Sequence, residues 1–260
     1  MSDPAEIVID VRNLKVGYGD NVILQNVNFQ VKRGEVFVIL GGSGCGKSTL
    51  LKNMIGLFEP LEGEIHIEGV NLVTTQGDER RSLLRKFGVA YQSGAMFGSL
   101  TVLENVRMPM DELTAMPEPL KEWEALAKLK LVGLGTAAQK MPSELSGGML
   151  KRAAIARAMA LDPRILFLDE PSAGLDPVTS ADLDILIRAL AQRFGITFVI
   201  VTHELASIYK VADRVIMLDR GARTIIAEGR PADLRDTSTD PLVRRFFNRE
   251  PDMFASGLKI

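Results

Sequence analysis

A short apolar strand that leads into a glycine-rich loop and then a helix constrains this sequence most. The strand Val36–Leu40 precedes the run Gly41-Gly42-Ser43-Gly44-Cys45-Gly46-Lys47-Ser48, and a helix is predicted over Ser48–Ile55. Glycines let successive backbone N–H groups turn toward one anion, and a helix N-terminus attracts negative charge. In such a loop Lys47 reaches the β and γ phosphates, and the Ser48 hydroxyl holds Mg²⁺. The pattern predicts binding of a nucleoside triphosphate, in preference to an incidental glycine-rich turn.

Composition and charge limit the classes of protein that remain. The 260 residues include 46% hydrophobic and 25% charged side chains, which indicates a folded soluble protein and excludes disorder, collagen and coiled coil. Lys and Arg number 31 against 33 Asp and Glu, so we expect no nucleic-acid partner. The single cysteine excludes an intrachain disulfide. Residues 1–10 are acidic, whereas a signal peptide begins with a basic segment. The longest apolar runs are shorter than the ~18 residues that a membrane span requires. We therefore expect a cytoplasmic protein, for which other chains make any membrane crossing.

Alternating strand and helix patterns predict an α/β fold. Short β-rich segments near the start indicate a small sheet layer, and three later runs are almost continuously apolar, as buried parallel strands are. Between Leu100 and Leu161, helix-favouring residues predict a helical insertion between two parallel strands. A hairpin turn is predicted at Asp219-Arg220-Gly221, followed by a polar, helix-favouring tail after Gly229. The expected strands are Ile7–Val11, Val27–Val31, Val36–Leu40, Glu64–Glu68, Val89–Gln92, Ile165–Leu168, Phe198–Val201, Arg214–Leu218 and Arg223–Ala227.

Two adjacent carboxylates, Asp169 and Glu170, end the apolar run that begins at Ile165. Side chains at the carboxyl end of a parallel strand point toward a ligand beyond the sheet edge. Asp169 suits a Mg²⁺ contact, direct or through water, and Glu170 can orient or deprotonate an attacking water. Adjacent acids also occur as ordinary surface residues, so their interpretation as a catalytic pair depends on the phosphate-binding loop.

A serine and two glycines open a second helix with an apolar stripe, in the run Leu145-Ser146-Gly147-Gly148-Met149. The N-terminus of such a helix can bind an anion, and the serine can equally serve as a simple N-cap. Spacing alone favours the N-cap.

Six motifs in order resemble the ATP-binding cassette proteins, and the similarity covers about residues 7–229. The resemblance implies a RecA-like phosphate-loop core with a mostly parallel sheet, an N-terminal antiparallel β subdomain and an inserted α-helical subdomain. It implies a nucleotide-binding domain at 5–230, with the helical subdomain at about 93–161, and a C-terminal tail at 231–260. The motifs are the phosphate-binding loop, Gln92, Leu145-Ser146-Gly147-Gly148, Asp169-Glu170, Ser172-Ala173-Gly174-Leu175-Asp176 and His203.

The same resemblance implies ATP hydrolysis with Mg²⁺ in a head-to-tail homodimer. Each ATP then lies between the phosphate-binding loop of one chain and the Ser146 helix terminus of the other. The implied catalytic residues are Lys47, Gln92, Glu170 and His203, and the implied metal ligands are Ser48, Gln92 and Asp169. The implied nucleotide-binding residues are Tyr18, Gly41, Gly42, Ser43, Gly44, Cys45, Gly46, Lys47, Ser48 and Thr49, with Ser146, Gly147, Gly148 and Met149 acting across the dimer.

Several of these roles have simpler alternatives. Gln92 is expected to sense Mg²⁺ and the nucleophilic water and to connect them to the helical subdomain, and Asp176 is expected to cross the dimer. His203 is expected to contact the γ-phosphate, although a lone histidine at a strand end is usually structural. Tyr18 resembles the aromatic residue that stacks on adenine, and an ordinary strand-end tyrosine is the alternative. His66 matches no motif, so we expect it to be structural.

Met149 is the fifth residue of the run Leu145–Met149, which we call the signature segment, and it indicates a particular group within the cassette family. Most cassette proteins have glutamine there, and simple helix packing is the other interpretation of this methionine. The segment Ser172–Asp176 departs from the Phe-Val-Gly-Gln-Asp of typical Mla ATPases, which leaves the subfamily open. The segments that resemble the ATPases of MCE-protein lipid transporters, such as the bacterial Mla phospholipid system, are Met149, Gln92–Phe97, Met116–Leu120, Met141–Leu145 and Asp240–Phe246.

This resemblance implies phospholipid transport between the inner and outer membrane, driven from the cytoplasmic side of the bacterial inner membrane. Expected partners are an MlaE-type integral membrane permease docked near residues 92–110, a periplasmic MCE-domain lipid-binding protein and a small STAS-domain subunit. The alternatives are the ATPase of a small-solute importer, a cassette ATPase acting on DNA or ribosomes, and a binding module with an inactive site. In the tail, Leu242–Ile260 carries Phe246, Phe247 and Phe254, and we expect either an amphipathic helix on the ATPase dimer or a disordered end.

Overall fold

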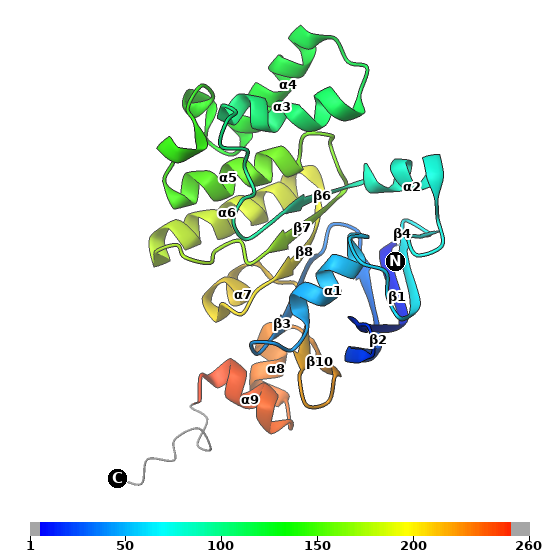
Figure 1. Ribbon diagram of the computed structural model, residues 1–260. Coiled ribbons are helices and arrows are strands. Elements are labelled where there is room, and N and C mark those ends of the chain that lie inside the picture. Colours follow the sequence, from blue (N-terminus) through cyan, green and yellow to red (C-terminus); the bar gives the residue numbers. More distant parts are fainter. Residues whose placement is uncertain (1–5, 251–260) are drawn as a thin grey trace, which may run out of the picture.

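The computed structural model describes residues 6–250, and its strands form two sheets that enclose a shared core (Figure 1). One is an antiparallel sheet in the order β2-β1-β4-β5, and the other has the order β10-β9-β3-β8-β7-β6. In the larger sheet, β10 alone runs antiparallel to its neighbour among the described strands. The strands are β1 (Ile7–Tyr18), β2 (Asn21–Lys32), β3 (Val36–Gly41), β4 (Glu62–Ile67), β5 (Val70–Asn71), β6 (Phe87–Ala90), β7 (Ile165–Asp169), β8 (Thr197–Val201), β9 (Arg214–Asp219) and β10 (Thr224–Gly229).

Helices cover both faces of the larger sheet. Helix α1 lies between the two sheets, and α5, α6 and α7 pack on the opposite face, while α3 and α4 form the end of the molecule away from α8 and α9 (Figure 1). In the described part of the chain, no helix is both long and apolar enough to cross a membrane. The helices are α1 (Lys47–Met54), α2 (Gly77–Leu84), α3 (Val102–Leu113), α4 (Glu118–Leu131), α5 (Gly147–Ala158), α6 (Pro177–Phe194), α7 (Leu205–Val211), α8 (Pro231–Thr237) and α9 (Pro241–Asn248), with short 3₁₀ turns at Gly135–Ala137 and Pro142–Glu144.

Strand β3 divides the hydrophobic core into two parts. Its side chains alternate between the faces of the sheet, because successive residues of a strand point in opposite directions. Val36, Val38 and Leu40 join the core beneath α5, α6 and α7, whereas Phe37 and Ile39 join the core around α1 and the antiparallel sheet. All five side chains are fully buried. Burial on both faces explains why the central parallel strands are apolar at every position.

The predicted fold class is confirmed, since a mostly parallel sheet, an antiparallel β layer and an inserted helical segment are all present. The boundaries proposed for the helical subdomain, 93 and 161, stay a prediction. The expected strand Val89–Gln92 was wrong in extent, because β6 pairs with β7 from Phe87 only as far as Ala90, opposite Leu168. Gln92 therefore lies in the loop that follows β6.

Strands β1 and β2 extend well beyond the expected five-residue segments, to 12 residues each. Asn13 and Asn26 have positive φ angles of 46° and 52°, and the register between the two strands shifts around them. Irregularities of this kind interrupt the two-residue alternation that marks a strand in a sequence. The hairpin was consequently longer than its sequence pattern indicated.

The tail begins with two helices that pack on this same chain. In α9, Val243 and Phe247 are buried in the core beneath α7 and α8, and the Phe247 ring lies 6.1 Å from that of Tyr209. The Phe247 carbonyl also accepts a hydrogen bond from the Tyr209 hydroxyl. The expected amphipathic helix is thus present over Pro241–Asn248, and its packing on an ATPase dimer stays a prediction. Residues 251–260 of the predicted segment, including Phe254, lie outside the described residues.

We predict that Phe247→Ala lowers the free energy of unfolding by about 3 kcal/mol, because it opens a cavity where a buried ring packs. Leu242→Ala is the matched control, since Leu242 is 42% exposed on the same helix and should cost little. Chemical denaturation of the two variants measures the difference. Equal midpoints would show that α9 adds nothing to the stability of the core.

Candidate active site

The register of the parallel strands brings four loops to one edge of the larger sheet. Strand β8 pairs with β3 on one side and with β7 on the other, so Val201 lies opposite both Ile39 and Asp169. Strand β6 continues the sheet, with Ala90 opposite Leu168. The phosphate-binding loop, Gln92, the Asp169-Glu170 pair and His203 each follow one of these strands, and they are therefore neighbours at the carboxyl edge, where ligands of open α/β sheets bind.

The phosphate-binding loop turns through glycines that no other residue could easily replace. Gly41 and Gly46 have φ angles of 151° and 101°, which L side chains rarely adopt. A Cβ atom on Gly41 would lie 2.5 Å from the Leu218 carbonyl oxygen, and one on Gly46 would lie 2.7 Å from Cγ2 of Ile23. The strands on either side therefore press directly against the loop backbone, which fixes its shape.

The N-terminus of α1 and the Lys47 ammonium together make an anion site. Gly46 is the N-cap of α1, and no side-chain hydrogen bond caps the helix there, so its first N–H groups can bind an anion. The Lys47 ammonium donates to the carbonyl oxygens of Gly41 at 2.8 Å and Gly42 at 3.0 Å, which holds it against the loop. Ser48 is exposed beside it. These groups have the composition that the phosphates of a nucleotide require.

Cys45 is an inward-facing member of the loop. Its side chain is 2% exposed, and its Sγ would lie 2.6 Å from a Cβ atom placed on Gly41. Burial raises the pKa of the thiol, although the nearby Lys47 opposes this effect. Both features suit a small residue that fills space under the loop.

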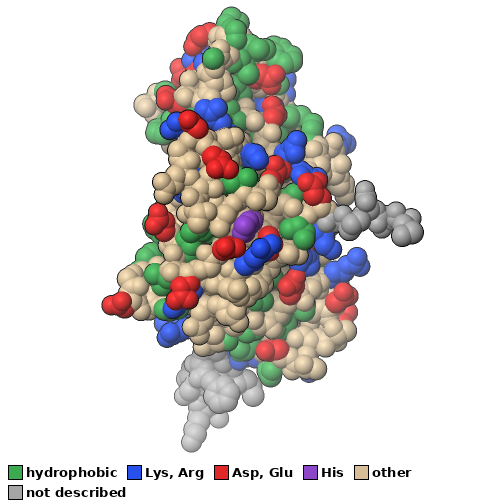
Figure 2. All heavy atoms as spheres, turned by 90° about the vertical axis from the view of Figure 1, so that its right-hand side faces the viewer, with side chains coloured by type: hydrophobic (Ala, Val, Ile, Leu, Met, Phe, Trp, Pro, Cys, Tyr) green, Lys and Arg blue, Asp and Glu red, His purple; other side chains and the backbone are tan. Residues whose placement is uncertain are grey.

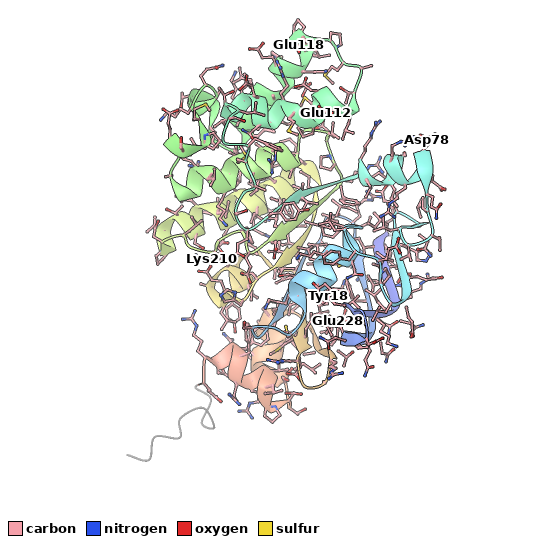
Figure 3. All side chains as sticks on the ribbon, in the orientation of Figure 1. Tyr18, Asp78, Glu112, Glu118, Lys210 and Glu228 are labelled. Atoms are coloured by element: carbon pink, nitrogen blue, oxygen red, sulfur yellow. The ribbon has the colours of Figure 1, made fainter. Side chains whose placement is uncertain are left out.

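Tyr18 lies beside α1, at the end of β1 (Figure 3). Its hydroxyl is 3.4 Å from Oγ1 of Thr49, and its ring meets the edge of Phe58 with centroids 5.7 Å apart. Tyr18 is 50% exposed, so much of its ring remains available for a planar ligand. Sequence reasoning missed Phe58, which carries no motif and is brought to Tyr18 only by the turn after α1.

Asp169 has the features of a metal ligand. Its Oδ1 atom is buried and has no hydrogen-bond partner among the described residues, which is costly for a carboxylate unless a cation or water completes it. Burial raises the pKa of this carboxyl, and the charge of Glu170 raises it further, while Lys52 and Lys47 oppose the shift. A bound Mg²⁺ would supply the missing partner, so the residues present fit this ion.

Glu170 and His203 meet directly. Oε1 of Glu170 is 2.8 Å from Nδ1 of His203, and the Glu170 side chain is 13% exposed against 66% for the histidine. Glu170 also has a φ of 46°, a left-handed conformation that is uncommon outside glycine and that often marks a functional position. Its backbone N–H donates to the Val201 carbonyl oxygen at 2.8 Å. The structure thus pairs the two residues that sequence reasoning named separately.

Gln92 lines a groove of about 590 Å³ together with residues of α5 and the end of β7. Its side chain is exposed, while its backbone carbonyl oxygen accepts a hydrogen bond from the ammonium of Lys151. Lys151, which sequence reasoning missed, is buried on α5 and lines the same groove as Asp169. No motif marks it, because its importance depends on contacts between segments far apart in the chain.

The signature segment starts α5 as an N-cap and packs closely on α6. Oγ of Ser146 accepts a hydrogen bond from the Met149 N–H at 3.3 Å, so the predicted cap is present. A Cβ atom on Gly148 would lie 2.2 Å from Cγ2 of Thr179, so any larger residue would have to displace that side chain. Met149 is half-buried against the core, in agreement with helix packing. No hydrogen bond or ion pair among residues 6–250 joins this segment to the phosphate-binding loop.

Asp176 caps α6 within its own chain. Its carboxylate accepts hydrogen bonds from the N–H groups of Val178 at 3.0 Å and Thr179 at 3.1 Å, and from the Thr179 hydroxyl at 2.5 Å. The Thr179 hydroxyl and then its backbone N–H lower the pKa of Asp176. His66, by contrast, lies on the antiparallel sheet, where it contacts Glu64 at 2.9 Å, so it has no part in the site.

Comparison with known proteins gives consistent matches. A family model described as ABC transporter matches residues 24–173. The intermembrane phospholipid transport system ATP-binding protein MlaF of Haemophilus influenzae is 40% identical over 94% of this chain and 92% of its own length, and that of Escherichia coli K12 is 38% identical over 93% and 88%. The probable ribonucleotide transport ATP-binding protein mkl of Mycobacterium leprae is also 40% identical, over 94% of this chain and 70% of its own length.

Solved structures agree with the fold and the chemistry. A dimeric ATP-binding cassette in a post-hydrolysis state, bound to ADP and Pi, has a TM-score of 0.76 and 33% identity over 85% of this chain and 98% of its own. CbiO1 from Clostridium perfringens has a TM-score of 0.80 and 29% identity over 94% of this chain and 96% of its own. The chain belongs to the ABC transporter family. It is an ATPase that uses ATP with Mg²⁺.

We predict that Cys45 reacts slowly with iodoacetamide at pH 7, because the thiolate is the reactive form and burial raises the thiol pKa above its ordinary 9.0. The rate should keep rising as the pH passes 9.0, and ATP should slow it at every pH. Alkylated protein should lose ATP binding, since the added group needs the space under the loop. Mass spectrometry follows the labelling, with Cys45→Ser as the unreactive control. Rapid labelling at pH 7 that ATP leaves unchanged would contradict this geometry.

Proposed function

We propose that this chain hydrolyses ATP to drive MCE-linked, Mla-like phospholipid transport between the inner and outer membrane. The observation that carries the proposal is the similarity to MlaF, 40% in the Haemophilus influenzae protein, which extends over nearly the whole of both chains. Met149 in the signature helix, where glutamine is usual in the family, supports it. The Ser172–Asp176 segment keeps the general cassette form, so the subfamily within the MCE systems stays open.

The ATPase of a small-solute importer is the second candidate. The mkl relative is as similar as MlaF, and it is named as a probable ribonucleotide transport protein. Identity therefore does not separate the two kinds of cargo. The share of each relative that this chain covers favours phospholipid transport, because the chain spans 92% of the Haemophilus influenzae MlaF and 70% of mkl.

The phosphate-binding loop and Lys47 hold the triphosphate in place for hydrolysis. Loop N–H groups and the α1 N-terminus bind the phosphate oxygens, and the Lys47 ammonium moves from the Gly41 and Gly42 carbonyls toward the β and γ phosphates. The Tyr18 ring stacks on adenine. Ser48, Asp169 and Gln92 would hold Mg²⁺, whose positive charge would offset that of the phosphates.

Glu170 acts as the general base of the reaction. Its carboxylate orients the attacking water and accepts a proton from it, a role that requires an ionised side chain within hydrogen-bond reach of the water. The contact between Glu170 and His203 holds the carboxylate in the site before ATP arrives. His203 is exposed enough to turn toward the γ-phosphate, which frees the Glu170 oxygen for the water.

A second copy of this chain completes the site. Ser146 and Gly147 are exposed at the N-terminus of α5, yet no hydrogen bond or ion pair joins them to the phosphate-binding loop of their own chain among the described residues. We infer a head-to-tail homodimer in which the partner subunit's Ser146 and α5 N-terminus face the γ-phosphate. Asp176, which caps its own helix α6, lies in the loop that meets the partner.

The helical end of the molecule is the proposed contact with an MlaE-type permease. Phe97, Leu113, Leu120 and Trp123 are 40–64% exposed, and apolar side chains gather at this end in the space-filling view (Figure 2). Glu112 and Glu118 lie at the same end of α3 and α4 (Figure 3). An apolar patch with charges around it is typical of a protein interface. Such docking makes this chain a peripheral subunit on the cytoplasmic face of the inner membrane, working with a periplasmic MCE-domain protein and a small STAS-domain subunit.

We predict that Glu170→Gln lowers kcat for ATP hydrolysis by about 10²- to 10⁴-fold while ATP still binds, because the amide cannot accept the proton. Lys47→Ala should instead weaken ATP binding. The control is Glu64→Gln, since Glu64 is an exposed acid on the antiparallel sheet and away from the site. Steady-state hydrolysis and equilibrium nucleotide binding separate the two effects. Near-normal turnover by Glu170→Gln would reject Glu170 as the base.

Purification of the membrane complex tests which substrate is transported. We predict that the tagged chain, purified from bacterial membranes in mild detergent, brings with it a multi-span permease and an MCE protein identified by mass spectrometry. The eluate should hydrolyse ATP and contain phospholipid. A permease with a soluble solute-binding protein would reject the lipid role in favour of an importer, and ribosomes or nucleic acid would reject transport altogether.

A further inference from the structure

Lys151 is a buried cation whose ammonium meets two distant parts of the site. Lys151 is 8% exposed, and it lines the same groove as Asp169 and Gln92. The ammonium donates to the backbone carbonyl oxygen of Gln92 and, at 3.3 Å, to that of Glu170. One side chain on the signature helix thus connects the loop after β6 to the residue after β7.

The bond to Glu170 matters because that residue has an unfavourable backbone conformation. A φ of 46° in a residue other than glycine or asparagine persists only where neighbouring groups hold it. The backbone N–H of Glu170 donates to the Val201 carbonyl oxygen, and its carbonyl oxygen accepts hydrogen bonds from the Ala173 N–H at 3.1 Å and from the Lys151 ammonium at 3.3 Å. The bond to Ala173 comes from the loop that follows β7, whereas the bond to Lys151 is the one that connects this peptide to helix α5.

Charge in the groove favours an ammonium at this position. Burial lowers the pKa of Lys151, while the charges of Glu170 and Asp169 oppose that shift and favour the protonated form. A second cation on α5, the Arg157 guanidinium, donates to the carbonyl oxygens of Ala95 at 2.7 Å and Gly94 at 3.0 Å. Two residues of α5, Lys151 and Arg157, therefore hydrogen-bond to the loop that contains Gln92, and of these two Lys151 also bonds to Glu170.

We propose that Lys151 is a positioning residue that holds Glu170 in its reactive orientation while α5 is docked on the sheet. The inference rests on the proposed role of Glu170 as general base. If α5 moves relative to the sheet with the helical end of the molecule, the Lys151 bonds break and Glu170 loses its alignment. Hydrolysis is then linked to the position of the helix that carries the signature segment.

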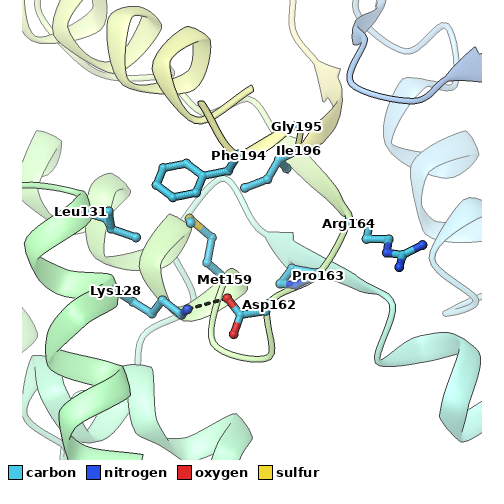
Figure 4. A pocket seen from close by; sticks show the side chains of 9 residues that line it. All are labelled: Lys128, Leu131, Met159, Asp162, Pro163, Arg164, Phe194, Gly195 and Ile196. Atoms are coloured by element: carbon cyan, nitrogen blue, oxygen red, sulfur yellow. Dashed lines mark hydrogen bonds and ion pairs between the residues drawn. The ribbon is translucent and has the colours of Figure 1, made fainter. Parts of the chain in front are cut away.

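The test compares two buried lysines. Lys151→Met removes the ammonium and keeps most of the side-chain volume. The matched control is Lys128→Met, because Lys128 is 7% exposed on α4 and pairs with Asp162 at a different pocket, beside Leu131 and Met159 (Figure 4). Both changes remove a buried charge, so a general loss of stability should appear in both.

We expect Lys151→Met to lower kcat by about 10- to 100-fold, since misplacing a catalytic group by about 1 Å has effects of this size. The dissociation constant for ATP should change less than ~3-fold, because the hydrogen bonds of Lys151 go to the Gln92 and Glu170 carbonyl oxygens and not to the phosphate-binding loop. Lys151→Arg, which keeps the charge and the donors, should recover most of the loss. Lys128→Met should leave both constants within ~3-fold of the unchanged protein. A normal kcat for Lys151→Met, or equal losses in kcat and ATP affinity, would overturn the proposal.

A double-mutant cycle with Glu170→Gln separates this inference from the role of Glu170 itself. If Lys151 acts through Glu170, adding Lys151→Met to Glu170→Gln should lower the single-turnover rate by less than ~3-fold further. A further loss as large as that of the single Lys151→Met change would overturn the positioning role while leaving Glu170 as the base. Normal hydrolysis by Glu170→Gln alone would reject the base, and with it the reason for Lys151 to act there.

Discussion

The pairing of β8 with β3 and β7 is the constraint on which the rest of the structure depends. Because these strands are parallel and in register, the loops that follow them meet at one edge, where the phosphate-binding loop, Asp169-Glu170 and His203 become neighbours. Both faces of the strands are buried, so the register is fixed by side chains packing above and below the sheet. The chemistry of the site is therefore a consequence of core packing.

Much of this arrangement could be predicted from the sequence. The central strands are continuous apolar runs because they are buried on both faces, and the phosphate-binding loop needs glycines at fixed places because of its positive φ angles and close neighbours. Each of these features is determined by residues close together in the chain, so it can be recognised in a short stretch of the sequence. Ser146 as an N-cap of α5 was predictable for the same reason, since a cap is set by residues three positions apart.

Features that depend on tertiary contacts could not be predicted. The bulges at Asn13 and Asn26 hide the true length of β1 and β2, and the end of β6 is set by pairing with β7 rather than by its own residues. Lys151 carries no motif, because its two carbonyl partners are 59 and 19 residues away along the chain. The contact between Glu170 and His203 likewise arises only when β7 and β8 pair, so sequence reasoning named both residues without joining them.

Closure of two copies of the chain around ATP is the step on which the proposed mechanism depends. Among residues 6–250 no hydrogen bond or ion pair joins the signature helix to the phosphate-binding loop, and this is the reason for proposing that a partner completes the site. Sedimentation velocity of the Glu170→Gln protein, with and without MgATP, measures this step directly, because a variant that cannot hydrolyse should keep the closed state. The predicted result is a monomer without nucleotide and a dimer of twice the mass with MgATP. A monomer at saturating MgATP would contradict the two-chain site.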